Sequence, residues 1–132
     1  AGCANVNNLG AVLIGLVSGV LVVYSINFLE KKGFDDAVGA VSVHGICGIW
    51  GVLAVAIFDT TDGLVYGGGA TLFLPQLIGI LAIGAWAYGT SFLVFKAIDS
   101  TVGLRVTAEE EIAGLDATEH GTSAYGDFIT KK

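Results

Sequence analysis

One histidine lies in the middle of a long apolar stretch and is the first candidate for chemistry. His44 is the only titratable side chain between Asp36 and Asp59, apart from the Cys47 thiol. A neutral imidazole carries one hydrogen-bond donor and one acceptor, so it can relay a proton or bind a small polar solute. Within a membrane span, such a side chain is a functional candidate, because a partner or a role must offset its desolvation. The alternative is a neutral histidine that hydrogen-bonds to a neighbouring helix.

The residues on either side of His44 are small. Ala40 and Gly48 lie four residues before and four residues after it, so all three share one face of a helix. We therefore expect Ala40, His44 and Gly48 to line a conducting path. A face without bulky side chains suits a narrow lumen, and it suits a close contact with another helix equally well.

Enzyme chemistry is not indicated. The sequence has no Walker loop, no set of nucleophile, histidine and acid, and no dinucleotide fingerprint. We predict no catalytic residues and no cofactor. The two cysteines, Cys3 and Cys47, and the two histidines lack zinc-binding spacing, so no metal site is predicted either.

The elements that must position His44 follow from the distribution of charge. Asp, Glu, Lys and Arg are absent from residues 1–29, 37–58 and 63–95. Each run exceeds the roughly 20 residues that a helix needs to cross the hydrocarbon core. The sequence predicts an all-α membrane protein with transmembrane helices at about 9–29, 37–58 and 72–98. Residues 99–132 are predicted to form a polar cytoplasmic tail.

Local signals mark where two of these helices begin. Asp35 and Asp36 precede the second span, where a carboxylate caps free amides and favours the positive end of the helix dipole. In the tail, Thr107 and Glu110 have the spacing of a capping box. A short tail helix is predicted at about 108–113.

Small residues recur at helical spacing and predict close packing between the spans. They are Gly15 and Gly19 on the first helix, and Gly45, Gly48 and Gly51 on the second. Small side chains let helix backbones approach closely in lipid. We therefore expect the three spans to form a tight bundle through these faces.

Composition and loop charge complete the description. Hydrophobic residues make up 54% of the chain, charged residues 14%, and the net charge is −6. These values exclude disorder and nucleic-acid binding. Lys31 and Lys32 follow the first helix, Lys96 lies in the last turn of the third and Arg105 follows it, which predicts cytoplasmic ends there and an N-terminus outside. Because no signal peptide is evident, an upstream part of the protein is expected.

The segment around His44 resembles a known signature. Asp35 to Gly51, with the sequence DDAVGAVSVHGICGIWG, is similar to the signature of the ammonium transporter family, which includes Amt, Mep and Rh proteins. Two flanking regions agree. Ala1 to Ala4 and Gly10 to Gly15 resemble the start of that family's ninth helix. The cytoplasmic tail of the family resembles Ser100 to Val106, Glu109 to Asp116, Glu119 to Gly121, and Ala124 with Tyr125.

The resemblance implies the C-terminal part of an eleven-helix transporter. Members form homotrimers in the cell membrane, with a separate pore in each subunit and two facing pore histidines. His44 matches the second of these, and the first belongs to the missing upstream half. The implied function is ammonium transport: ammonium loses a proton at the pore mouth and ammonia passes the histidine pair. A PII-type signalling protein is an implied partner at the cytoplasmic face.

Two departures and two alternatives accompany this hypothesis. Ala37 replaces a proline found in many members, and Gly39 replaces an acid found in some, so the start of the second helix is left open. The alternatives are an ammonium sensor on the same fold and a membrane assembly subunit that does not transport. Eight further upstream spans with a second pore histidine would indicate the transporter, whereas termination directly upstream would indicate a separate subunit.

Overall fold

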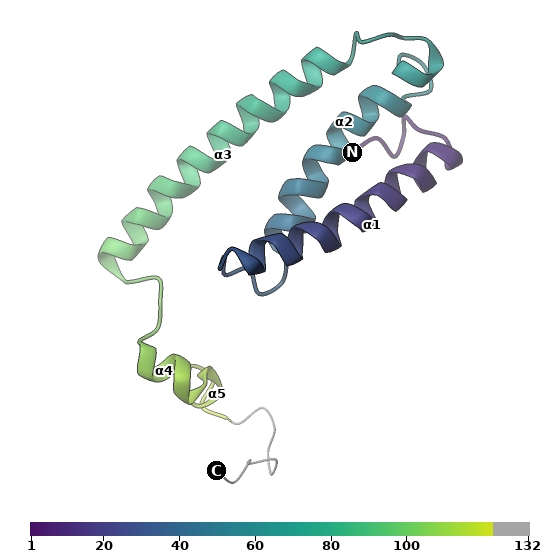
Figure 1. The fold of residues 1–132 in the computed structure, drawn as a ribbon. Coiled ribbons are helices and arrows are strands. Elements are labelled where there is room, and N and C mark those ends of the chain that lie inside the picture. Colours follow the sequence, from purple (N-terminus) through teal and green to yellow (C-terminus); the bar gives the residue numbers. More distant parts are fainter. Residues whose placement is uncertain (123–132) are drawn as a thin grey trace. The chain divides into compact units, whose positions relative to one another are not determined.

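A computed structural model describes residues 1–122, and every regular element in them is a helix (Figure 1). The predicted all-α class is therefore confirmed. The long helices are α1, the π-helix η1 with α2 directly after it, and α3. Short helices follow in the loop and the tail. Their bounds are α1 Asn8–Lys31, η1 Val41–Ile46, α2 Cys47–Phe58, η2 Leu64–Tyr66, α3 Phe73–Thr101, α4 Ala108–Ala113 and α5 Leu115–Thr118.

Three helical segments are long and apolar enough to cross a membrane, as predicted. They are Asn8–Lys31, Val41–Phe58 and Phe73–Thr101, with 24, 18 and 29 residues. At 1.5 Å per residue their lengths are about 36, 27 and 43 Å, close to or above the roughly 30 Å of a hydrocarbon core.

The second span begins four residues later than the sequence suggested, at Val41 rather than Ala37. Gly39 has φ +67°, a left-handed conformation that interrupts a helix. Asp36 then caps the helix across this break, because its two carboxylate oxygens accept the amide N–H groups of Ala40 and Val41 at 2.8 and 2.9 Å. The other spans differ from the expected bounds by three residues or fewer.

The chain divides into two compact units, residues 1–86 and residues 87–132, which are described separately. In the first unit, α1 and the η1–α2 segment run antiparallel and pack side by side (Figure 1). The Trp50 indole N–H donates to the Ile14 carbonyl at 3.2 Å, and the Cys47 thiol donates to the Ser18 carbonyl at 3.6 Å. These contacts fix which face of α1 meets the second span.

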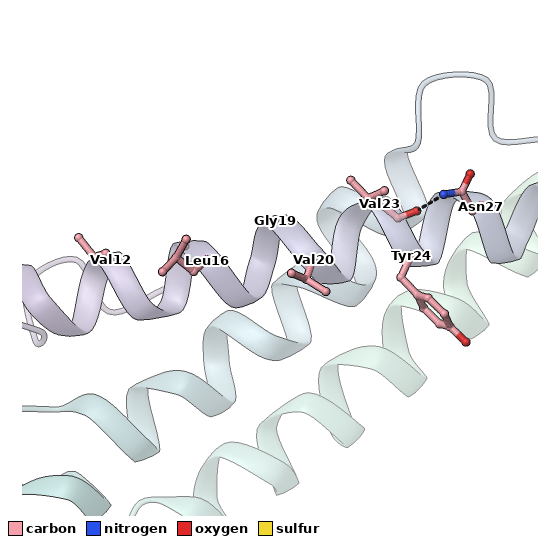
Figure 2. A pocket seen from close by; sticks show the side chains of 8 residues that line it. Val12, Leu16, Gly19, Val20, Val23, Tyr24 and Asn27 are labelled. Atoms are coloured by element: carbon pink, nitrogen blue, oxygen red, sulfur yellow. Dashed lines mark hydrogen bonds between the residues drawn. The ribbon is translucent and has the colours of Figure 1, made fainter.

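The contact between α1 and the second span does not use Gly15 and Gly19, contrary to our expectation. Both glycines are exposed, and a Cβ added to either would meet nothing within 4 Å. The contacts at Ile14 and Ser18 rotate the glycine face away from α2. It forms part of an open groove of about 820 Å³ along α1 (Figure 2), lined by Val12, Gly15, Leu16, Gly19, Val20, Val23, Tyr24 and Asn27.

A polar connection joins the N-terminal segment to the exit of α2. The Asn5 side-chain amide donates to the Asp59 carboxylate at 2.9 Å. The Thr60 backbone N–H donates to the Asn5 carbonyl at 2.9 Å. Asn7 caps α1 by accepting the Gly10 N–H at 2.9 Å. The open end of the α1–α2 hairpin is therefore closed by hydrogen bonds.

The second unit contains the end of α3 and the described part of the tail. Gly103, with φ +82°, follows α3. The predicted capping box is present at α4: the Thr107 hydroxyl accepts the Glu110 N–H, and the Glu110 carboxylate accepts the Thr107 N–H. The backbone N–H and the hydroxyl of Thr107 both donate to the Glu110 carboxylate, and they hold its pKa below its usual value. The tail expected at 99–132 is described only to residue 122, so the similarity at Ala124 and Tyr125 lies outside the described residues.

Candidate functional site

His44 lies in the π-helical segment η1 at the start of the second span. π-Helical turns are rare and occur frequently at functional sites, because the inserted residue changes the direction of the side chains around it. The Cys47 N–H donates to the Ser42 carbonyl, five residues earlier, as the π pattern requires. Sequence reasoning missed this turn. The glycines near it show only that the backbone is permissive.

The packing of η1 directs His44 away from the helix pair. Ser42 is fully buried, with 0% of its surface exposed, whereas His44 is exposed. Residues two apart on a helix point to roughly opposite sides. Within residues 1–122, the imidazole has no hydrogen-bond partner. The described residues therefore do not provide the neighbouring-helix partner of the alternative hypothesis.

The space in front of His44 is open among the described residues. Ala40 is exposed, and a Cβ added to Gly48 would meet nothing within 4 Å. A Cβ on Gly45 would meet only the Val41 side chain, at 3.8 Å. Among the described residues, Ala40, His44 and Gly48 thus form an uncovered face with a single polar side chain.

Further along the second span, the N-terminal segment covers the same face. Gly51, Val55 and Asp59 follow Gly48 at spacings of three and four residues, so they lie on one side of α2. A Cβ on Gly51 would lie 3.8 Å from the backbone nitrogen of Ala1. The uncovered stretch beside His44 therefore ends about one and a half to two helical turns away, roughly 10 Å along the axis.

Asp59 ends the covered face and is held as a carboxylate. The N–H groups of Asp62 and Thr61 donate to one of its oxygens at 2.9 and 2.8 Å, and the Asn5 amide donates to the other. These three donors, in that order of effect, hold its pKa below its usual value. Residues 59–63 have the sequence DTTDG, and an Asp followed by such residues is typical of a turn in which the side chain bonds the backbone. The partner Asn5, 54 residues away, gave no signal.

The remaining predicted residues lie at the start of the second span or at its contact with α1. Asp36 caps the second span as described above, and Asp35 is exposed beside it. Cys47 is half-buried and bonded to the Ser18 carbonyl. Within residues 1–122, no three His, Cys, Asp or Glu side chains are grouped closely enough to hold a metal ion. The chemistry that the uncovered face offers is hydrogen bonding and proton exchange at one imidazole.

Three apolar spans and a histidine facing small residues define a multi-pass membrane protein with a polar group on an uncovered helix face. The Ammonium Transporter Family model matches residues 1–125. The chain therefore belongs to the ammonium transporter family, whose members are transporters and not enzymes.

Individual relatives are similar in sequence to almost the whole of this chain. Ammonium transporter Amt2 of Archaeoglobus fulgidus is 40% identical over 98% of this chain and 30% of its own length. The putative ammonium transporter sll1017 of Synechocystis is 41% identical over 96% of the chain and 27% of its own length. The ammonium transporter of Bacillus subtilis is 38% identical over 90% of the chain and 31% of its own length. The chain thus spans less than a third of the length of these relatives.

Proposed function

We propose that this chain forms part of an ammonium transporter in which His44 lines the conducting path. The observation that carries the proposal is the position of His44. It lies in a π-helical turn of a membrane span, exposed, and without a partner among residues 1–122, with Ala40 and Gly48 leaving space in front of it. A histidine that served only to pack against α1 would occupy the place of Ser42.

The physical chemistry of the face favours passage of ammonia over passage of ammonium. An ammonium ion in an apolar path carries a desolvation cost of the order of several kcal/mol. Neutral ammonia carries far less. Deprotonation at the mouth and passage of ammonia is thus the route with the lower barrier. His44 then hydrogen-bonds ammonia or passes a proton to a second histidine, which the family resemblance assigns to the upstream half.

The test uses the full-length protein in liposomes, with an internal pH reporter and a recording of charge movement. We expect His44→Ala to lose conduction or to admit potassium. Gly48→Leu should block conduction, because a Cβ at this position would meet nothing within 4 Å and the rest of the side chain would occupy the open space beside the imidazole. The matched control is His120→Ala, since His120 is the other histidine of this sequence and lies exposed in the tail. Unchanged rate, ion selectivity and charge per event in His44→Ala would contradict the proposal.

The surroundings of the path are proposed from loop charge and from the family resemblance. The N-terminus faces outside, and the tail from Asp99 faces the cytoplasm of a cell-membrane homotrimer. There the tail contacts neighbouring subunits and a PII-type protein. The basic residues after the first and third spans support this orientation. Deleting residues 104–132 should alter transport or its control by nitrogen supply, and an unchanged response in a flux assay would refute a role for the tail.

A further inference from the structure

A small pocket lies at the end of α3, within the second unit, and nothing described so far uses it. Its volume is about 270 Å³, and its walls are Phe92, Phe95, Lys96, Asp99 and Leu104. Gly103, in the left-handed conformation, lets the chain turn so that Leu104 contributes to the wall. The volume has room for roughly nine water-sized groups, which is the scale of a phosphoethanolamine headgroup.

The pocket holds two opposite charges that do not pair with each other. Lys96 and Asp99 both line it, and both are exposed. The Lys96 ammonium lies 5.9 Å from the centre of the Phe92 ring, a cation–π contact. Among residues 1–122, neither charge has an ion-pair partner within 4 Å. A ligand with one positive and one negative group, a short distance apart, would satisfy both.

The depth of the pocket in the membrane follows from the sequence and from the aromatic side chains. The charge-free run of residues 63–95 ends at Lys96. Tyr88 and Phe92 stack with their ring centres 6.3 Å apart on the preceding turns, and Phe95 directly precedes Lys96. Aromatic residues and the first lysine after an apolar span mark the boundary between hydrocarbon and headgroups. The charged part of the pocket therefore lies at headgroup level.

We propose that this pocket binds a zwitterionic phospholipid whose positive group is a primary ammonium, as in phosphatidylethanolamine. The phosphate pairs with Lys96, the ammonium donates hydrogen bonds to Asp99, and an acyl chain lies along Phe92 and Phe95. The choline group of phosphatidylcholine has no N–H to donate, so it interacts more weakly with the carboxylate. Phosphatidylglycerol offers Asp99 no cation, and its net charge is repelled by the carboxylate.

The experiment is a lipid titration of the delipidated full-length protein, followed by native mass spectrometry. The probes are phosphatidylethanolamine, phosphatidylcholine and phosphatidylglycerol with identical acyl chains, and the readout is the dissociation constant of the first bound lipid per subunit. Wild type should prefer phosphatidylethanolamine over phosphatidylcholine by about two- to fivefold, the size of one partly exposed ion pair. Asp99→Asn should bring that ratio to about one, while Lys96→Gln should weaken binding of all three lipids by a similar factor.

The matched control is Lys32→Gln. The Lys32 ammonium lies 5.8 Å from the Phe28 ring at the end of α1, but it lines none of the pockets described above. This variant should keep the wild-type preference between lipids. The two tested positions are exposed, so size-exclusion elution should show that both variants remain folded. A wild-type ratio of one, a preference that survives in Asp99→Asn, or unchanged affinities in Lys96→Gln would each overturn the proposal.

Discussion

Two serines are buried in the helix pair, and their hydroxyl groups differ in one respect. Ser25 is 5% exposed, and its hydroxyl donates to the Val22 carbonyl at 3.1 Å. Ser42 is 0% exposed, and its hydroxyl has no partner among the described residues. A buried hydroxyl without a partner costs about 1–3 kcal/mol, whereas a bonded one does not.

The difference predicts opposite effects of the same substitution. Ser42→Ala should raise the free energy of unfolding by about 1 kcal/mol, because it removes an unsatisfied group and few atoms. Ser25→Ala should lower it slightly or leave it unchanged. Thermal unfolding of the purified full-length protein, followed by tryptophan fluorescence, measures both. A larger loss from Ser42→Ala than from Ser25→Ala would show that the Ser42 hydroxyl is bonded.

Asp59 predicts a dependence of stability on pH. Its pKa in the folded protein lies below the usual 3.8. A carboxylate whose folded pKa is lowered stabilises the protein fully above the unfolded value, and this stabilisation is lost as pH falls through the folded value. Wild-type stability should therefore fall below about pH 3.8, and Asp59→Asn should flatten that fall.

The control for Asp59 is its neighbour Asp62. The Asp62 side chain is exposed, and its carboxylate makes no hydrogen bond within the described residues. Asp62→Asn should keep the wild-type profile when the melting temperature is measured between about pH 6 and pH 3. Equal pH profiles of the melting temperature for Asp59→Asn and Asp62→Asn would show that Asp59 does not determine the loss of stability in acid.

At the scale of elements, the start of the second span depends on one cap. Asp36→Ala removes the acceptor for the Ala40 and Val41 amides and should lower the free energy of unfolding by about 1 kcal/mol. Asp36→Asn keeps one acceptor oxygen and should lose less. Because η1 follows this cap directly, conduction should fall in the same order. Chemical denaturation and liposome flux measure the two effects, and equal losses from both variants would contradict the role of the cap.

The elements show what sequence can and cannot supply. Hydropathy and charge are local properties, so the charge-free runs located three spans, and the Thr107–Glu110 pattern located α4. The rotation of α1 is a tertiary property. Gly15 and Gly19 were expected at the helix contact, but the bonds from Trp50 and Cys47 to α1 turn them outward. Small residues indicate that a helix face allows close packing, but they do not indicate which helix packs there.

The candidate site also has features that the sequence predicts and features that it does not. His44 was predicted because an isolated imidazole in an apolar run is visible from residue types alone. Its π-helical turn was not predicted, since it depends on a hydrogen-bond register that residue types alone do not reveal. The pairing of Asn5 with Asp59 was not predicted either, because no local pattern links residues so far apart.

For the whole molecule, the proposed orientation predicts which cysteines a membrane-impermeant thiol reagent reaches. Cys3 is exposed and should be labelled on intact cells, whereas Cys47 is half-buried and should not be. Ser100→Cys, at an exposed position on the proposed cytoplasmic side, should be labelled only after permeabilisation. The full-length protein needs its other cysteines replaced for this assay. Labelling of Ser100→Cys on intact cells would reverse the orientation.

The hydrogen-bonded closure between Asn5 and Asp59 has a consequence for biosynthesis. The two residues are 54 positions apart, so at about 5–20 residues per second Asp59 is synthesised roughly 3–11 s after Asn5. Under the proposed orientation both residues lie on the outer side of the membrane, so the closure forms only after the second span has crossed. From that moment it opposes withdrawal of either span into the translocation machinery. The hairpin would then be released into lipid as a pair, with the His44 face already turned away from α1.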